Sequence, residues 1–194
     1  MHTSLPLLRA LGFATEGDNG GGLDSTISLK TSLMNLDRTS QTAGQYDLME
    51  TAFHEINEVL GFTSVLPGGV QGAPAPTGAI GSADLFRYSA PGVRSFNTTL
   101  GATAYLSIDG GTTSLANFNQ TVGGDFHDFN GTPPSVQDAF GTPGTQLNNG
   151  LGELTALDVI GYNLTPVPES STAMALGASV LLGVAFLRER RRSA

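Results

Sequence analysis

Cysteine is missing from all 194 residues of the chain, and basic residues are scarce. The absence of cysteine excludes a disulfide framework and any site built on thiolates. Nine lysines and arginines stand against seventeen acidic residues, so the net charge is −8. Because so acidic a protein repels the phosphate backbone of nucleic acids, we expect no nucleic-acid partner.

Charged residues of both signs together make up only 13% of the chain, about half the usual share, and they are unevenly distributed. Four of the nine basic residues lie at 188–192, and without the segment from Arg188 onward 5 basic and 16 acidic residues remain, a net charge of −11. Glycine (26 residues) and proline (10 residues) fill the deficit, together with many serines, threonines and asparagines. This composition is typical of a loop-rich exported protein, and recurring apolar clusters distinguish it from a disordered chain.

An uncharged run of 17 residues, 171–187, lies directly before the arginine cluster. This length is at the short end for a membrane-spanning helix, and a basic cluster after such a helix stays on the cytoplasmic side. We therefore predict a transmembrane helix at 171–187 that leaves the body of the protein outside. The alternative is a buried core helix with a basic end.

The residues before this run, Val167, Pro168 and Glu169, resemble the start of the PEP-CTERM sorting signal of exported bacterial proteins. That signal combines a Pro-Glu-Pro-like motif, a short hydrophobic helix and a basic end, and Ser170 stands here where the second proline is usual. The resemblance implies export, transient anchoring in the membrane, and cleavage of the tail by an exosortase-type enzyme. It also implies a final location at the cell surface or in the extracellular matrix.

Export requires an N-terminal signal, and residues 1–13 do not resemble one. They have no charged n-region, and their apolar stretch is interrupted by Pro6 and Arg9. We expect that the natural protein begins further upstream. The alternative is that Met1 is the true start and that the protein is not exported.

The body of the chain indicates an α+β domain. Alternation and turn residues predict strands at 25–32, 85–88, 93–96 and 102–108, and apolar periodicity predicts helices at 45–60 and 151–160. Residues 117–150 are expected to be mostly loop. We therefore divide the chain into a flexible N-terminal segment (1–24), one domain (25–165) and the sorting tail (166–194).

The predicted helix at 45–60 carries the residues of greatest chemical interest. His54 and Glu58 are four residues apart, which makes them neighbours on the helix surface, and Glu55 lies beside them. An imidazole and a carboxylate at this spacing can bind one cation, and a second carboxylate can act on a bound water. The same pair also occurs by chance on the polar faces of helices. The apolar residues of the helix fall on one broad face, which comprises Leu48, Met49, Ala52, Phe53, Ile56, Val59 and Leu60.

The segment from His54 to Gly61, HEINEVLG, is similar to the zincin signature HExxHxxG, with Glu58 in place of the second histidine. Together with the segments at 84–89, 105–111, 124–125 and 154–162, it resembles a family of PEP-CTERM-tailed bacterial metalloprotease-like proteins. The resemblance runs from about residue 24 to the tail. It implies a loop-rich, zincin-like fold whose active-site helix packs on a small mixed sheet. It also implies that His54 binds zinc and that Glu55 is the general base for hydrolysis of a peptide or protein substrate.

The remaining zinc ligands do not follow from the signature. Glu58 is either a carboxylate ligand or no ligand, and the position expected for a third ligand in the extended metzincin pattern is Ser64, a poor donor. The best alternative is the segment 124–128, where Asp125, His127 and Asp128 are potential ligands within four residues. The alternative, which the sequence favours, is that His127 is a solvated loop histidine.

Other carboxylates are weaker candidates. Asp84 and Glu153 are each better interpreted as a turn or helix-start residue. Calcium, which prefers several oxygen ligands, is an alternative metal at 109–111 or 125–128, although the EF-hand spacing is absent.

Two functions remain. One is a zinc-dependent peptidase; the other is a non-catalytic extracellular or surface domain on a degenerate zincin scaffold. Convergence of His54, Glu58 and a further ligand on one point favours the first function. A Glu58 that points to solvent, or that pairs with Arg87 or Arg94, favours the second.

Overall fold

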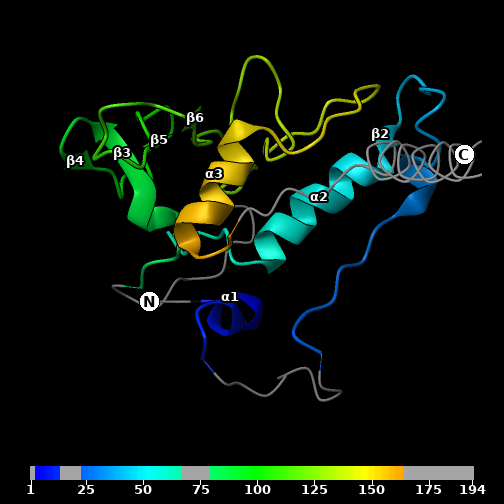
Figure 1. Cartoon of the computed structure of the whole chain (residues 1–194). Coiled ribbons are helices and arrows are strands. Elements are labelled where there is room, and N and C mark those ends of the chain that lie inside the picture. The colour runs from blue at the N-terminus through cyan, green and yellow to red at the C-terminus, as the bar shows by residue number, and fades with distance from the viewer. Residues whose placement is uncertain (1–2, 14–22, 67–78, 164–194) are drawn as a thin grey trace, which may run out of the picture. The chain divides into compact units, whose positions relative to one another are not determined.

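The computed structural model describes residues 3–13, 23–66 and 79–163, and this part of the chain forms a small α+β fold (Figure 1). The chain divides into two units, Met1–Tyr162 and Asn163–Ala194, and the elements described below all lie in the first. The described helices are α1 (Leu5–Ala10), α2 (Leu48–Val59) and α3 (Leu151–Ile160), with short 3-10 turns at η1 (Thr31–Leu33) and η2 (Ala83–Phe86).

The strands form two small sheets rather than the single mixed sheet that was expected. β1 (Met34–Asn35) and β2 (Tyr46–Asp47) pair in parallel. The second sheet is antiparallel and has the order β4-β3-β5-β6, formed by β3 (Arg87–Ala90), β4 (Val93–Arg94), β5 (Tyr105–Leu106) and β6 (Ala116–Asn117). Gly92, with φ of 73°, makes the tight turn between β3 and β4, because glycine adopts positive φ without a steric penalty.

The prediction of a strand at 25–32 is wrong. These residues contain no strand, and the chain enters η1 at Thr31 before β1 begins. Nearly all of their side chains are exposed, Ile27 included. The alternating pattern therefore has no buried sheet face to match, which is the condition that makes alternation diagnostic of a strand.

The core lies where α3, the four-stranded sheet and the end of α2 meet. Phe62, which follows α2, contacts Phe118 and Phe129 with ring centroids 6.2 and 5.7 Å apart, and all three rings are buried. The same cluster contains Leu7 of α1, Leu106 of β5, and Ala156, Leu157 and Ile160 of α3. Burial of each such aromatic side chain stabilises the fold by about 1.5–3 kcal/mol.

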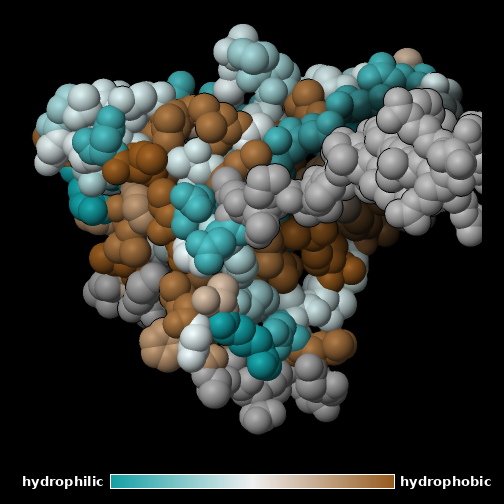
Figure 2. Space-filling model, viewed as in Figure 1, coloured by the Kyte–Doolittle hydropathy of each residue, from teal (hydrophilic) through white to brown (hydrophobic). Residues whose placement is uncertain are grey.

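Helix α2 buries polar residues, while part of its apolar face is exposed. Glu50 and Asn57 are its buried residues, while Met49 and Ile56 are 45% and 40% exposed. Figure 2 shows further hydrophobic patches on the surface in view. The side of α2 that faces the loops before α3 is polar because it takes part in hydrogen bonds and in the site described below.

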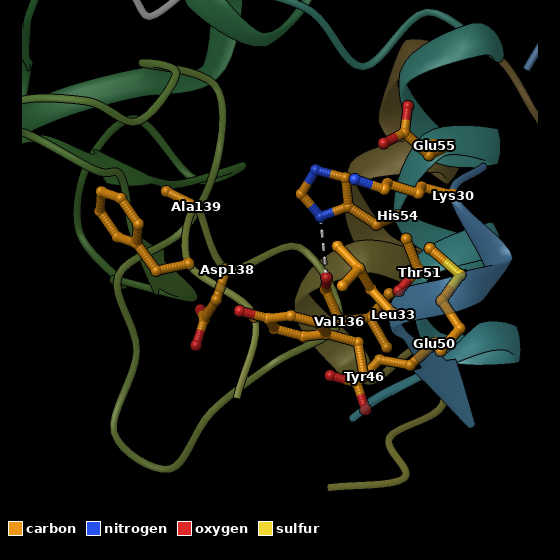
Figure 3. A pocket seen from close by; sticks show the side chains of 13 residues that line it. Lys30, Leu33, Tyr46, Glu50, Thr51, His54, Glu55, Val136, Asp138 and Ala139 are labelled. Carbon is orange, nitrogen blue, oxygen red and sulfur yellow. Dashed lines mark hydrogen bonds between the residues drawn. The ribbon is translucent and has the colours of Figure 1, made fainter. Parts of the chain in front are cut away.

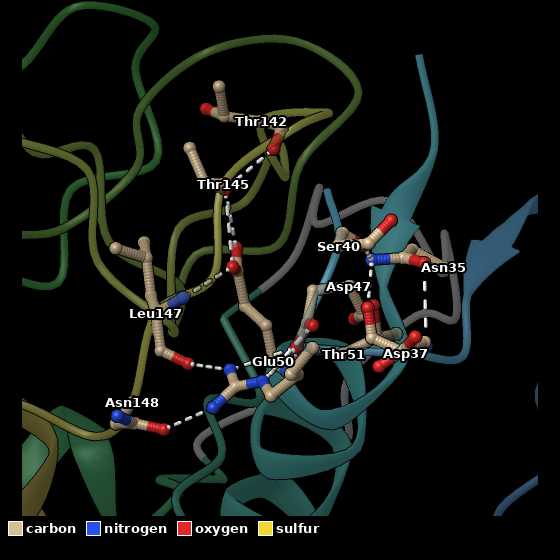
Figure 4. A network of polar contacts seen from close by, with 11 residues as sticks. Asn35, Asp37, Ser40, Asp47, Glu50, Thr51, Thr142, Thr145, Leu147 and Asn148 are labelled. Atoms are coloured by element: carbon tan, nitrogen blue, oxygen red, sulfur yellow. Dashed lines mark hydrogen bonds and ion pairs between the residues drawn. The ribbon is translucent and has the colours of Figure 1, made fainter. Parts of the chain in front are cut away.

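Both ends of α2 are held by specific contacts. Asp47 caps the first turn by accepting from the Glu50 N–H at 2.7 Å and also pairs with Arg38, while Glu50 accepts from the Leu147 N–H at 2.8 Å (Figure 4). At the other end Gly61 has φ of 108°, in agreement with its predicted place after the helix. The loop at 142–148 and the turn after β1 thus fix the position of the helix.

Among the residues that the structure describes, no helix is long and apolar enough to cross a membrane. The predicted membrane helix at 171–187 and the sorting motif of Val167, Pro168 and Glu169 lie outside these residues.

Candidate metal centre

Two segments far apart in the sequence bring histidine and carboxylate side chains together. Helix α2 presents His54 and Glu58 one turn apart, as its period requires. The loop after β6 supplies Asp125, His127 and Asp128. Buried Asn119 ties this loop down, because its N–H donates to the Asp128 carbonyl at 2.7 Å and its amide donates to the Asp125 carbonyl at 3.2 Å.

The donor atoms of these side chains converge. His127 Nε2 lies 2.8 Å and His54 Nε2 lies 3.4 Å from the same oxygen, Glu58 Oε1. Both Nε2 atoms lie 3.6 Å from Asp128 Oδ1. Donor atoms of Glu58, Asp125, His127 and Asp128 all lie within 4.8 Å of one another. The cluster could therefore hold a metal ion, with His54 at its edge.

The imidazole of His54 is oriented for coordination. Its Nδ1 lies 3.0 Å from the backbone carbonyl of Val136, which can only accept, so Nδ1 carries the hydrogen (Figure 3). In the neutral ring the lone pair is then on Nε2, the atom that faces Glu58 and Asp128. A hydrogen bond from the far ring nitrogen to a carbonyl is the usual way in which a metal-binding histidine is held.

The pKa values of the cluster show that it favours positive charge at its centre. Burial alone would lower the pKa of His54, but Glu58 and Asp128 outweigh burial and raise this pKa to about 9. The pKa of His127 is raised in the same way against burial, chiefly by Glu58. Burial would raise the pKa of Glu58, but hydrogen bonds from both imidazoles lower it to about 2. Without a cation, protons on the imidazoles supply the positive charge.

Asp128 differs from Glu58, although the two carboxylates share the same histidines. Burial raises the pKa of Asp128 to about 6, and the histidines only partly offset this effect. Its side chain is 5% exposed, whereas that of Glu58 is 26% exposed. Asp128 is therefore the ligand candidate that is most costly to ionise in the absence of a positive partner.

Glu55 lies next to the cluster, on the edge of a cavity. Partial burial, followed by the charge of Glu58, raises the pKa of this carboxyl. Glu55 and His54 line a cavity of about 380 Å³ whose other walls include Lys30, Leu33, Tyr46, Val136 and Phe140 (Figure 3). A water or a polar substrate group in this cavity could reach both Glu55 and the imidazole.

The weaker candidates from the sequence have structural roles. Asp84 accepts from Ser64 Oγ at 2.6 Å and from the Gly81 N–H at 2.8 Å. Glu153 accepts from the N–H groups of Gln137 and Gly150 at the start of α3. The Asp109 carboxylate accepts from Ser107 Oγ and from the Thr113 N–H within its own turn.

The arginines considered as partners for Glu58 are engaged elsewhere. Arg87 is buried and donates to the Phe126 carbonyl, and Arg94 donates to the Leu85 carbonyl. Glu58 instead pairs with both histidines. The arrangement favoured by the non-catalytic interpretation is therefore not the one observed.

The sequence does not reveal the residues that hold the candidate ligands in place. The sequence indicates Asp128 as one of three potential donors in its segment, but it gives no signal for Val136, Gln137 or Asn57. No motif marks Val136 or Gln137. Their contacts, of Val136 with His54 and of Gln137 with Asp128, depend on how the loop folds back.

Comparison with known proteins found no matching family model, no matching curated protein and no matching solved structure. What the fold and the site define is a small α+β protein with a histidine–carboxylate cluster that could hold a metal ion.

Proposed function

We propose that this protein is a zinc-dependent peptidase of zincin-like type, exported and sorted to the cell surface. The proposal is carried by one observation: His54, Glu58, His127 and Asp128 converge from a helix and a distant loop. Glu55, the residue next to His54, lies beside them on a cavity.

The donor set fits zinc better than calcium. Zinc binds imidazole nitrogen and carboxylate oxygen, whereas calcium takes oxygen ligands almost alone, and two of the converging donors are imidazoles. We assign His54, Glu58, His127 and Asp128 as the ligands, with Asp125 as a further carboxylate in reach. A bound zinc ion would polarise a peptide carbonyl and acidify water in this site.

Glu55 acts as the general base. Its carboxylate oxygen accepts the proton of the attacking water and passes it to the leaving amine. A general base works best when its pKa is near the working pH, and the pKa of Glu55 is raised toward that range by burial and by Glu58.

The cavity beside Glu55 receives the substrate. Its apolar wall of Leu33, Tyr46, Val136 and Phe140 suits an apolar side chain of a peptide, and burial of that side chain holds the scissile bond near Glu55. The negative charge of the protein disfavours nucleic acid as a substrate.

The tail supplies the location. In this proposal residues 171–187 anchor the exported protein in the membrane until an exosortase-type enzyme cuts near Pro168 and Glu169. In cells with such an enzyme, the double change Pro168→Ala and Glu169→Ala should leave the protein full-length in the membrane fraction. Equal release and equal mass of the altered and natural proteins would refute tail-directed sorting.

Metal content is the decisive measurement. We expect the full chain, purified without chelators, to contain one equivalent of zinc by elemental analysis, and His54→Ala and Asp128→Ala to contain much less. Asp158→Ala, an exposed acid on α3, is the matched control and should keep its metal.

The outcomes separate the two functions. A folded natural chain that takes up no zinc refutes the peptidase proposal. A chain that binds zinc but cleaves no member of a broad fluorogenic peptide library favours the non-catalytic surface domain, for which the loss of the second histidine is the supporting observation.

A further inference from the structure

A short segment, Val136–Gln137, contacts two members of the cluster. The Val136 carbonyl accepts from His54 Nδ1 at 3.0 Å, and Gln137 Nε2 donates to Asp128 Oδ1 at 3.0 Å. His54 comes from α2 and Asp128 from the loop. One segment therefore orients a candidate ligand from each of the two sources.

The Gln137 amide has a single satisfactory orientation. An ionised carboxylate only accepts hydrogen bonds, so Nε2 must face Asp128 and Oε1 must find a donor. That donor is Asn57 Nδ2 at 3.0 Å. Asn57 also exchanges two hydrogen bonds with Asn149, at 3.1 and 3.2 Å, so the orientations of all three amides follow from Asp128 outward.

Burial makes this arrangement rigid. Gln137 is 0% and Asn57 1% exposed, so neither amide can turn to water. The Gln137 backbone is held as well, because its N–H donates to Glu153 Oε1 and its carbonyl accepts from the Phe129 N–H at 2.7 Å. A buried amide that rotated away would leave its partners without hydrogen bonds, which is costly.

The oxygen that Gln137 holds is the one that faces the histidines. Asp128 Oδ1 lies 3.6 Å from both His54 Nε2 and His127 Nε2. We propose that Gln137, fixed by Asn57, is a positioning residue that aims Asp128 Oδ1 at the metal. This inference rests on the proposed metal site. In this arrangement α2 acts on the metal site in two ways: it supplies His54 and Glu58, and it supplies Asn57, which fixes Gln137.

A purely structural role for the network predicts something different. Asn57, Asn149 and Glu153 also join α2 to the start of α3, so loss of Gln137 would lower stability in either case. Only the positioning role predicts that the effect of Gln137 on metal binding requires Asp128. A double-mutant cycle separates the two roles.

The cycle compares zinc affinity of the full chain with those of Gln137→Met, Asp128→Ala and the double variant, by competition with a chromogenic chelator. We expect Gln137→Met to weaken zinc binding by about 10- to 100-fold in the natural background. In the Asp128→Ala background we expect a change of less than about 2-fold. The visible absorption of bound Co²⁺ should change with Gln137→Met, because the geometry of one ligand changes.

Asn35→Leu is the matched control. It removes another buried amide, one that donates to the carbonyls of Asp37 and Ser40. It should leave zinc affinity and the Co²⁺ spectrum unchanged. If Gln137→Met fails to fold, Asn57→Ser releases the Gln137 amide without touching Asp128 and should weaken zinc binding in the same background-dependent way.

The failures are distinguishable. Normal zinc affinity in folded Gln137→Met or Asn57→Ser, or an equal loss in both backgrounds, overturns the positioning role and leaves the metal site intact. Absence of zinc binding by the natural chain overturns the proposed function and, with it, this inference.

Discussion

At the scale of single residues, Glu58 is the residue that makes the cluster more negatively charged than the zincin signature would. It stands where the zincin signature has a histidine, and it pairs with both imidazoles. With Asp128 it brings two negative charges to the cluster. A more anionic ligand set holds a cation strongly but makes the metal a weaker acid and its bound water less acidic. We therefore expect a slow hydrolase rather than an efficient one, with more of the catalysis dependent on the base.

The Glu55→Gln variant tests that base. We expect zinc content to stay at one equivalent and kcat on a peptide substrate to fall by about 10²- to 10⁴-fold, because the amide cannot accept the proton. Asp158→Asn serves as the surface control. Undiminished hydrolysis by Glu55→Gln would show that another group is the base.

The pH dependence of stability tests the charge of the metal-free cluster. The folded-state pKa of His54 is raised from 6.5 to about 9, so its stabilising contribution is complete below pH 6.5 and is lost as pH rises through 9. The pKa of Glu58 is lowered from 4.5 to about 2, so its contribution is present above pH 4.5 and is lost as pH falls toward 2. In EDTA we expect Tm to fall between pH 6.5 and 9.

Added zinc should oppose the fall in Tm at alkaline pH. Metal binding requires imidazoles without the Nε2 proton, so the increase in Tm on adding zinc should grow from pH 6.5 to 9. Calorimetry of the natural chain and of His54→Ala measures both effects. If Tm in EDTA falls equally steeply above pH 6.5 in the two proteins, His54 is not the group whose titration causes the fall.

At the scale of elements, α2 is defined by its polar side. Asp47 caps the helix, Glu50 holds the loop at Leu147, and Asn57 joins the network behind Asp128. The apolar residues Met49 and Ile56, which lie on the broad apolar face of the helix, are partly exposed. A helix that carries two candidate ligands and the side chains that support the site uses its buried positions for hydrogen bonds.

Two neighbouring substitutions in α2 test whether its polar contacts stabilise the fold more than its exposed apolar residues do. Glu50→Ala leaves the half-buried Leu147 N–H without its acceptor and should lower the free energy of unfolding by about 1–3 kcal/mol. Met49→Ala, at a position that is 45% exposed, should cost less than about 1 kcal/mol. Urea denaturation monitored by circular dichroism compares the two. A larger loss for Met49→Ala would mean that the apolar face is packed after all.

At the scale of the whole described unit, the aromatic core joins the two segments that carry the candidate ligands. Phe62 follows α2, while Phe118 and Phe129 flank the loop that carries Asp125, His127 and Asp128. The distance between the candidate ligands of the helix and those of the loop therefore depends on the packing of these three rings. Metal binding and core packing should stabilise the same arrangement.

Phe62→Ala should lower the free energy of unfolding by about 3–5 kcal/mol, because it leaves a cavity between the other two rings. Zinc at a concentration about 100-fold above its Kd should restore about 2.7 kcal/mol in any variant that keeps the site. Phe96→Ala, at a position that is 45% exposed, is the control and should have a small effect. Chemical denaturation with and without EDTA gives both numbers.

Much of the secondary structure followed from local patterns. The helix predicted at 151–160 is α3 itself, and the helix predicted at 45–60 begins three residues later, after the Asp47 cap. The strands predicted at 85–88 and 93–96 are present in part as β3 and β4, and the strand predicted at 102–108 is present in part as β5. The strand at 25–32 is not, because alternation predicts a strand only where one face is buried.

The sequence by itself determined which side chains could serve as ligands, since cysteine is absent and a helical turn sets the distance between His54 and Glu58. It also determined the net charge of the chain and the uncharged run at 171–187 that precedes the arginine cluster. Only the tertiary structure decided that His127 and Asp128 meet those residues, that Val136 and Gln137 hold His54 and Asp128, and which side of α2 is buried. The reason is physical: spacing within one helix is local geometry, whereas a loop more than sixty residues away reaches the helix only through the packing of the whole domain.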